Sequence, residues 1–428
     1  MELISAIATA QGRGGVAIVR VSGDDALTLA KKMFSKKGEF TPNMLYAGEI
    51  DCGAFCDYGM CVYFRAPRSF TGEDVVEFHL HGGVEIARGA IQRTLELGAR
   101  LAERGEFTKR AFLNGKLSLA AAEGMADMIN AQSAAQVRAG YALYGEKLTR
   151  EGARLQAQLK RCLASVNADV DYPEEDLNRD SRAEISSTLE GVKKDLLSLL
   201  SQYRCGRKIK EGVIVALCGK PNAGKSTLFN ALLGYDRAIV SAEAGTTRDI
   251  VEGEIELGGV LFRLVDTAGL RDEGAGEIER EGIRRAQNAL SSADLILWLK
   301  EDEPPAVFPA ETPVITVGAK SDLIRREGCD VLVSAKSGEG IEALKKLIFE
   351  KGYGQENGTF LLEERHYRAA QAGLRAVEDA LCALSGGLPA ELYAADISRA
   401  WSALGEISGE TAAEAVITEI FEKFCVGK

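Results

Sequence analysis

The chain has 428 residues, of which 46% are hydrophobic and 27% charged, and this predicts a folded protein of two or three domains. Its formal charge of −11 excludes diffuse attraction of the whole chain to nucleic acid or to an anionic membrane. The 9 cysteines follow no disulfide pattern and no apolar stretch has membrane-spanning length, so we expect a cytoplasmic protein without membrane association.

Residues 1–116 show the short apolar runs and glycine turns of an α+β domain. Strands are expected at 3–8, 16–21, 61–64 and 75–81, and helices at 24–33 and 85–97. His79 and His81 leave one face of a strand, but without a third ligand they are expected to pack or to form hydrogen bonds rather than to bind a metal. Segment 104–117 is dense in charged and aromatic residues. It is either the solvated start of a helix or a cationic surface for an anionic ligand.

Residues 117–209 and 353–428 are rich in helix-forming residues with heptad-like apolar spacing, which predicts long antiparallel helices. An acidic turn with a proline interrupts the pattern at 171–176. Because the two helical segments flank residues 210–352, we expect that segment to be a domain inserted into a helical one. The last residues alone predict only a frayed end.

The segment 219–226 fits the phosphate-binding pattern G-x-x-x-x-G-K-[ST] without mismatch, between an apolar run at 213–217 and a helical pattern at 227–234. In such a loop, backbone N–H groups and the helix N-terminus surround a diphosphate. Lys225 is expected to reach the outer phosphates and Ser226 to ligate Mg²⁺. The expected binding residues are Asn222, Ala223, Gly224, Lys225, Ser226 and Thr227.

Further motifs follow in the order found in GTPases, and together they predict a GTP-binding domain with a doubly wound, mostly parallel sheet. Thr247 offers a second hydroxyl to the metal, and Asp266, at the end of an apolar run, offers a carboxylate to its shell. The residues expected to bind the phosphates and the metal are Gly245, Thr246, Thr247, Asp266, Thr267, Ala268 and Gly269. Those expected to bind the guanine base are Lys320, Asp322, Ser334, Ala335 and Lys336.

Two positions depart from the usual GTPase pattern. Leu270 follows Gly269 where many small GTPases have a water-orienting glutamine, so another group must orient water and another cation must replace an arginine finger. Ala319 replaces the asparagine of the base-reading motif, which predicts a loss of about 1–3 kcal/mol in nucleotide affinity. Asp322 still accepts hydrogen bonds that guanine can donate and adenine cannot, so guanine selectivity is expected.

Over its whole length the sequence resembles the MnmE (TrmE) family of tRNA-modification GTPases. The resemblance rests on segments 12–15, 20–23, 69–77, 81–83, 105–116, 171–175, 219–226 and 245–249, and on the terminal Cys425-x-Gly427-Lys428. It implies a homodimer whose N-terminal domain binds 5,10-methylene- or 5-formyl-tetrahydrofolate through Arg20, Glu77, Lys116 and Lys428. The role of Cys425 stays open between packing and catalysis.

The resemblance also implies a reaction and a partner. The family adds an aminomethyl or carboxymethylaminomethyl group to carbon five of the wobble uridine of tRNA. It does so in a heterotetramer with the FAD protein MnmG (GidA), which holds most of the tRNA. That division of labour suits the acidic charge of this chain.

For GTP hydrolysis, the resemblance implies that K⁺ takes the place of the arginine finger when two nucleotide domains meet. Its ligands would be Asn222, Ser241, Glu243 and Thr246. Glu279 aligns with the family's water-orienting glutamate after a one-residue shift. Because Glu277 and Glu281 are close neighbours, the alternative is that Glu279 is one of several solvated helix charges.

Two other functions fit parts of the sequence. A regulatory GTPase of ribosome assembly shares the nucleotide motifs but usually carries a basic RNA-binding appendage and lacks Cys-x-Gly-Lys. A folate-binding scaffold with a vestigial GTPase is favoured if Ala319 marks decay of the site. The intact Lys225, Ser226, Thr247 and Asp266 argue against decay.

Overall fold

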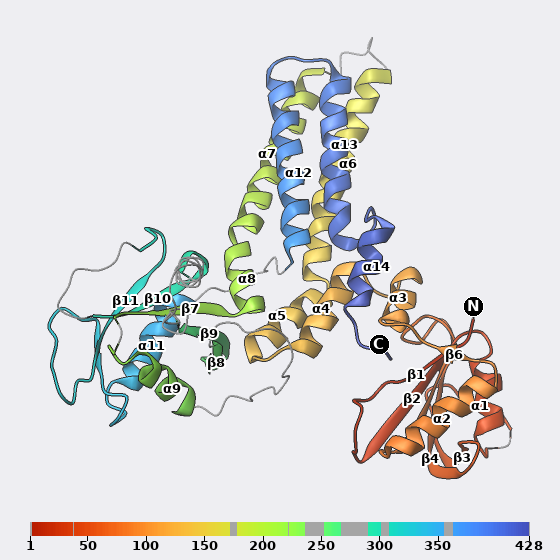
Figure 1. Cartoon of the computed structure of the whole chain (residues 1–428). Coiled ribbons are helices and arrows are strands. Elements are labelled where there is room, and N and C mark those ends of the chain that lie inside the picture. The colour runs from red at the N-terminus through yellow and green to blue at the C-terminus, as the bar shows by residue number, and fades with distance from the viewer. Residues whose placement is uncertain are drawn as a thin grey trace, which may run out of the picture. The chain divides into compact units, whose positions relative to one another are not determined.

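A computed structural model describes residues 2–36, 38–171, 178–220, 222–235, 252–266, 290–300, 308–354 and 363–427 (Figure 1). The chain forms two compact units. The first contains 1–126, 143–157 and 401–428, and the second contains 127–142 and 158–400. The helical part of the chain is therefore shared between both units.

The first unit is built on a six-stranded sheet of order β3-β4-β5-β2-β1-β6. Neighbouring strands are antiparallel except β1 and β6. The strands are β1 (Ile4–Ile7), β2 (Val16–Ser22), β3 (Leu45–Asp51), β4 (Cys56–Phe64), β5 (Val75–His81) and β6 (Arg100–Leu101). The four predicted strands are confirmed, whereas β3 and β6 were not anticipated because neither has a long apolar run.

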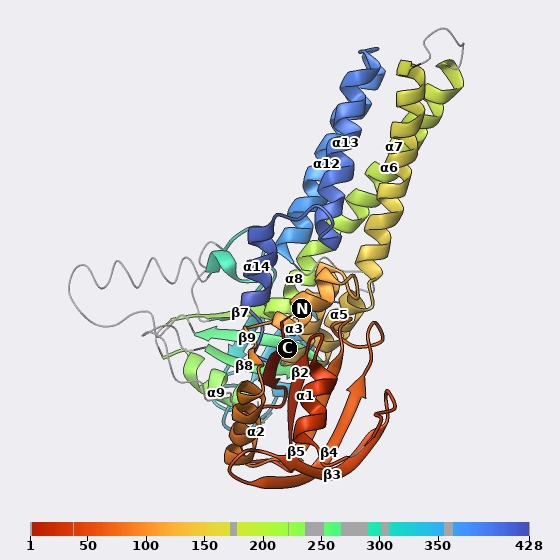
Figure 2. The same cartoon turned by 90° about the vertical axis from the view of Figure 1, so that its right-hand side faces the viewer.

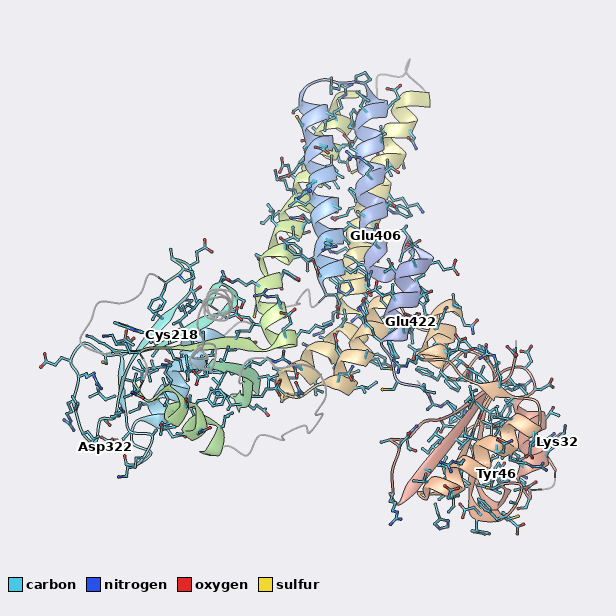
Figure 3. The ribbon with its side chains drawn as sticks, in the orientation of Figure 1. Lys32, Tyr46, Cys218, Asp322, Glu406 and Glu422 are labelled. Carbon is cyan, nitrogen blue, oxygen red and sulfur yellow. The ribbon has the colours of Figure 1, made fainter. Side chains whose placement is uncertain are left out.

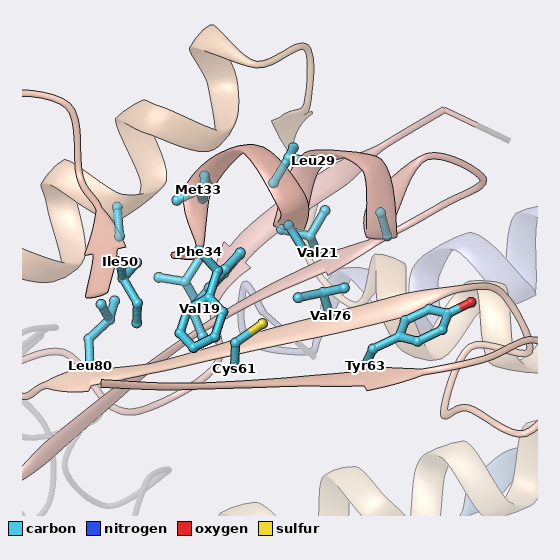
Figure 4. Packing of buried hydrophobic residues seen from close by; sticks show 14 of the residues in the cluster. Val19, Val21, Leu29, Met33, Phe34, Ile50, Cys61, Tyr63, Val76 and Leu80 are labelled. Atoms are coloured by element: carbon cyan, nitrogen blue, oxygen red, sulfur yellow. The ribbon is translucent and has the colours of Figure 1, made fainter. Parts of the chain in front are cut away.

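Helices α1 (Ala26–Met33) and α2 (Val84–Glu96), both predicted from the sequence, cover one face of this sheet. Alternate residues of the strands point toward them, and in Figure 4 Leu29 and Met33 of α1 lie over Val19, Val21 and Val76. Each such buried side chain contributes about 1.5–3 kcal/mol. This packing fixes which residues of β2 and β5 point the other way.

The opposite face of the sheet is here called the outer face. Helix α3 (Glu106–Leu113) covers one end of it, where Phe107 packs with Ile4, Ala6 and Ala102. Beyond α3 the outer face carries exposed apolar side chains from three strands: Val16, Leu45, Tyr58 and Met60. Arg20 and Glu77 also belong to this face because they alternate with the buried Val19 and Phe78.

The helical expectation is confirmed by eight helices in the described ranges. They are α4 (Leu119–Asn130), α5 (Ala134–Tyr144), α6 (Lys147–Asp171), α7 (Asn178–Ser201), α8 (Tyr203–Glu211), α12 (Glu364–Ser385), α13 (Ala390–Ser408) and α14 (Glu414–Glu422). In the second unit α7 runs along α12, as Figures 1 and 2 both show, and Lys193 Nζ lies 3.1 Å from Glu378 Oε1. None of the helices in the described ranges is long and apolar enough to span a membrane.

The second unit contains a six-stranded sheet of order β12-β11-β10-β7-β9-β8, parallel except for the β8–β9 hairpin. Its elements are β7 (Val213–Cys218), α9 (Lys225–Tyr235), β8 (Glu252–Leu257), β9 (Val260–Asp266), β10 (Leu295–Leu299), β11 (Val314–Ala319), β12 (Val331–Val333) and α11 (Ile341–Gly352). The strand order reverses at β7, and ligands of such sheets bind beside the carboxyl end of that strand. The chain is thus a multidomain α/β plus α protein, as predicted.

Candidate functional site

The loop that follows β7 places the phosphate-binding motif at the carboxyl edge of the parallel sheet. A Cβ atom at Gly219 would lie 3.1 Å from Leu299 Cβ, so the loop runs close to the end of β10. Gly224 has φ +99°, a conformation that L side chains rarely adopt. Its carbonyl accepts from Leu228 N at 2.9 Å, and α9 begins at Lys225. The helix N-terminus, with its partial positive charge, therefore points into the loop.

Lys225, Ser226 and Asp266 meet at this edge as the sequence predicts for a nucleotide and its Mg²⁺. The buried Lys225 Nζ donates to the carbonyls of Gly219 and Lys220, each at 2.7 Å. Ser226 Oγ lies 3.2 Å from Asp266 Oδ2, which comes from β9. A hydroxyl and a carboxylate are oxygen ligands that suit Mg²⁺. The two residues therefore fit a shared magnesium site.

The base-reading segments follow β11 and β12 at the same edge. Asp322 is exposed and projects from the loop after β11 (Figure 3). Lys320 Nζ donates to Asn222 O at 2.7 Å, which joins this loop to the phosphate loop. The buried Ser334 Oγ accepts from Ser337 N at 3.3 Å. The half-buried Ala335 and the exposed Lys336 follow it.

Several predicted site residues lie outside the described ranges, and their roles stay predictions. They are Ser241, Glu243, Gly245, Thr246, Thr247, Thr267, Ala268, Gly269, Glu279 and Lys428. Two further candidates lie in the described ranges. Ala223, within the loop, is buried, and Thr227, which follows Ser226, is exposed.

A second group of candidates lies on the outer face of the N-terminal sheet. Arg20 and Glu77 stand opposite each other on β2 and β5, and Arg20 Nε donates to Glu77 Oε1 at 2.8 Å. The guanidinium lies 5.8 Å from the ring centre of Phe70 and 5.7 Å from that of Phe107. Burial opposes ionisation of Glu77, but a hydrogen bond from His79 and the charge of Arg20 outweigh it and lower the pKa of Glu77. The sequence analysis did not place the two aromatic rings at this site, because they come from segments distant from Arg20 in the chain.

The C-terminal tail also reaches the N-terminal sheet. A Cβ atom at Gly427 would lie 2.2 Å from Ile7 O, and Gly105 N donates to Cys425 O at 3.5 Å. The expectation of a frayed end is therefore wrong for residues 425–427. Ile7 follows Ala6, which stands opposite Arg20 in the strand register, so the tail ends beside the Arg20 site.

Lys116 lies on the segment that follows α3. It is exposed, and its Nζ donates to Pro67 O at 2.8 Å. A Cβ atom at Gly72 would lie 3.3 Å from Lys116 Cγ. The stem of Lys116 therefore packs on the loop of residues 65–74, which also carries Phe70 of the Arg20 site.

Two residues of the charged segment 104–117, Glu106 and Arg110, belong to a buried ion network, whereas Arg104 and Lys116 are exposed. Arg110 bridges Glu73 Oε2 at 3.0 Å and Glu106 Oε1 at 2.9 Å, and Arg100 binds the same Glu106 oxygen at 2.7 Å. Although burial opposes ionisation of Glu106, the hydrogen bonds from Arg100, Glu103 N and Arg110 lower its pKa to about 2. Neither sequence interpretation anticipated this, because ion partners 37 residues apart leave no local pattern.

The histidines on β5 form hydrogen bonds, as the sequence favoured. His79 Nε2 lies 3.3 Å from Glu77 Oε2, and His81 Nδ1 lies 2.7 Å from Asp57 Oδ1. Within the described ranges no group of three or more His, Cys, Asp or Glu side chains is arranged to hold a metal ion.

Comparison with known proteins covers the whole chain. Two family profiles match, one described as the MnmE helical domain over residues 119–425 and one as the GTP-binding protein TrmE N-terminus over 3–116. The tRNA modification GTPase MnmE of Thiobacillus denitrificans is 41% identical, with 100% of this chain and 98% of that protein aligned. That of Chlorobium chlorochromatii is 36% identical with the same coverage. The G domain of the T. maritima FeoB iron transporter, 29% identical, covers 32% of this chain and 98% of its own with a TM-score of 0.24, too low to support an inference.

Proposed function

This chain belongs to the MnmE family of tRNA modification GTPases and is a GTPase acting in tRNA modification, and from that premise we propose its finer function. With an FAD-containing partner of the MnmG type, it installs an aminomethyl or carboxymethylaminomethyl group at carbon five of the wobble uridine. The one-carbon unit comes from a tetrahydrofolate, tRNA is held mainly by the partner, and the reaction takes place in the cytoplasm.

The approach of Ser226 Oγ to Asp266 Oδ2, 3.2 Å, is the observation that carries the nucleotide half of the proposal. Mg²⁺ supplies charge neutralisation for the β- and γ-phosphates when bound. Ser226 and Asp266 would hold it, and Lys225, whose Nζ donates to two carbonyls of the loop, would reach the same phosphates. Asp322 would accept from the N–H groups of guanine at the exposed edge of the site.

The exposed Asn222, at φ +65° in the phosphate loop, supports the proposal of a K⁺ site. Its side-chain amide oxygen is a suitable ligand for a monovalent cation that would replace the positive charge of an arginine finger, whereas its peptide oxygen accepts from Lys320 Nζ. Glu279 would orient the attacking water. Closure of this site would need a second copy of the chain, which makes hydrolysis depend on dimerisation.

Arg20 and Glu77 support the folate half of the proposal. A pterin presents neighbouring N–H donors, which an ionised carboxylate accepts well, and the lowered pKa of Glu77 keeps that group ionised. The glutamate tail of folate carries carboxylates that match the cations of Arg20, Lys116 and Lys428. Phe70 and Phe107 add apolar walls beside the guanidinium.

The outer face of the N-terminal sheet supports a homodimer. Leu45, Tyr58 and Met60 are 49%, 66% and 44% exposed, although strands of this composition normally pack against another surface. A second copy that covered this face would bury those side chains and lie next to Arg20 and Glu77. Folate binding and dimerisation would then share one surface.

Nucleoside analysis of bulk tRNA tests the proposed function. Cells that lack this chain are expected to lose the modified wobble uridines, and the wild-type chain should restore them. The Lys225→Ala chain should not, because its phosphate loop cannot hold GTP correctly. Persistence of the modified uridines in the deletion strain contradicts the proposal, provided that no other gene of that strain supplies the same activity.

A further inference from the structure

The base-reading loop of this protein has lost the side chain that usually braces it. In the motif Asn-Lys-x-Asp the asparagine connects the loop to its surroundings, but this chain has Ala319, which is 6% exposed and offers no polar side-chain atom. The Cβ atom of Ala319 lies 3.9 Å from the position that a Cβ atom of Gly224 would occupy. The phosphate loop therefore passes close to Ala319 without a side-chain hydrogen bond from that residue.

Two cations of the same loop make hydrogen bonds where that contact is missing. Arg326 Nη1 donates to the carbonyl of Ala319 at 2.7 Å, so it holds the last peptide group of β11. Lys320 Nζ donates to Asn222 O at 2.7 Å, and its stem lies 3.6 Å from the Cβ position of Gly224. Arg326 is half-buried, which makes its charged hydrogen bond stronger than one on an open surface.

The segment between these two residues carries the guanine-binding carboxylate. Lys320 O accepts from Leu323 N at 2.9 Å and from Ile324 N at 3.0 Å, which closes a tight turn around Asp322. Ser321 N donates to Val333 O at 3.0 Å and ties the start of the turn to β12. Lys300 Nζ donates to Glu327 O at 2.9 Å and fixes the far end. The orientation of the 319–320 peptide thus sets the direction of Asp322.

We propose that Arg326 is a positioning residue for guanine recognition, and that its hydrogen bond to the Ala319 carbonyl takes over the bracing role of the missing asparagine. Arg326 does not touch the base; it acts through the peptide that orients Asp322. This inference rests on the proposed guanine contact of Asp322. It explains how the chain can keep GTPase function with an incomplete base-reading motif.

Equilibrium binding of GDP and IDP to the full chain tests the proposal. IDP lacks the 2-amino group, so the affinity ratio of GDP to IDP reports how well Asp322 is placed. Arg326→Ala should weaken GDP about tenfold and bring the ratio close to one, since a charged hydrogen bond of this kind is lost. Arg326→Lys should keep part of the GDP affinity and part of the GDP to IDP ratio. Arg325→Ala, the exposed neighbour, should leave both values unchanged and serves as the matched control.

A double variant provides the decisive comparison. If Arg326 replaces the asparagine, Ala319→Asn should restore GDP affinity and the GDP to IDP ratio to the Arg326→Ala chain, and should change the wild-type chain much less. Equal effects of Ala319→Asn in both backgrounds, or an unchanged ratio in Arg326→Ala, overturn the inference. Asp322→Ala tests the contact between Asp322 and guanine independently of Arg326. If that change leaves the GDP to IDP ratio intact, Asp322 does not bind the base.

Discussion

In the GTPase sheet the candidate residues lie at the carboxyl ends of parallel strands and at the start of the helix that follows, whereas in the N-terminal sheet Arg20 and Glu77 project from the middle of paired strands. The first arrangement keeps Lys225, Ser226 and Asp266 together through backbone geometry and two strand ends. The second holds its charges by pairing them with each other. In the GTPase site the backbone therefore orients the charged side chains, as the hydrogen bonds of Lys225 Nζ to two loop carbonyls show. In the N-terminal unit, much of the charge is paired with other side chains and stabilises the fold.

This difference separates two kinds of variant. Changes in the GTPase loops should alter nucleotide chemistry with little loss of stability. Changes in the buried charges of the N-terminal unit should alter stability first. The predictions below test that separation, from the largest expected effect to the smallest.

The largest effect should come from the monovalent cation of the proposed site at Asn222. Replacing K⁺ by Na⁺ at constant ionic strength should lower GTP turnover by about 10³-fold, the lower end of what an arginine finger provides. Asn222→Ala should cause a similar loss in K⁺. Turnover is measured by phosphate release, and its rate per molecule should rise with protein concentration.

GDP affinity supplies the control for that experiment, because it should be the same in both salts and in both chains. Equal turnover in Na⁺ and K⁺ would rule out the proposed cation. A turnover per molecule that ignores protein concentration would rule out the dimeric site.

Arg110→Ala should destabilise the N-terminal unit by about 3–5 kcal/mol, because it leaves Glu73 and Glu106 buried without their shared cation. Hydrogen exchange of the β2 and β5 amides should accelerate accordingly, while exchange in β7 and β10 stays unchanged. Lys109→Ala, at the half-buried neighbouring position, is the matched control and should have a much smaller effect. Equal exchange rates in β2 for both variants would show that the ion network does not stabilise the fold.

Acid should reveal the same network without a substitution. The pKa of Glu106 is lowered to about 2, below its ordinary value of about 4.3, so its stabilisation is complete above the ordinary value and is lost as pH falls toward 2. The total loss should be about 3 kcal/mol. Denaturant titrations at pH 5 and pH 2.5 should differ by about 2 of these 3 kcal/mol, because pH 2.5 still lies above the lowered pKa. Glu106→Gln should reduce that difference. A wild-type chain with equal N-terminal stability at both pH values would contradict this assignment.

The same contrast explains which parts of the two sites could be predicted from the sequence. The phosphate loop and Asp266 were predicted because each motif is contiguous and marks one strand end. The Arg20–Glu77 pair is 57 residues apart in sequence and follows from strand register, which the sequence does not encode locally. Only the family resemblance named those two residues. The network around Arg110 was missed for the same reason. The edge strand β3 was missed because it has no long apolar run.

Glu77→Gln should weaken tetrahydrofolate binding about tenfold or more, because one charged hydrogen-bond acceptor is replaced by a neutral amide. The Gln side chain keeps the shape of the site, so GTP turnover should stay unchanged. Isothermal titration with 5-formyl-tetrahydrofolate measures the affinity. Glu85→Gln, the same chemical change at a 74% exposed position on α2, is the matched control and should leave the affinity unchanged. Unchanged affinity in Glu77→Gln would remove this residue from the proposed folate site.

The smallest effect should come from His79→Gln. Its effect on folate affinity shows whether His79 forms a hydrogen bond or binds a metal. The Nε2 of His79 lies 3.3 Å from Glu77 Oε2, a long contact, so His79→Gln should change folate affinity by less than about threefold. The amide of Gln still donates to the carboxylate, which preserves what the imidazole supplies. Zinc or chelator should likewise have no effect on either chain. If chelator abolished folate binding in the wild type but not in His79→Gln, the outer face of the N-terminal sheet would bind folate through a metal rather than through paired charges.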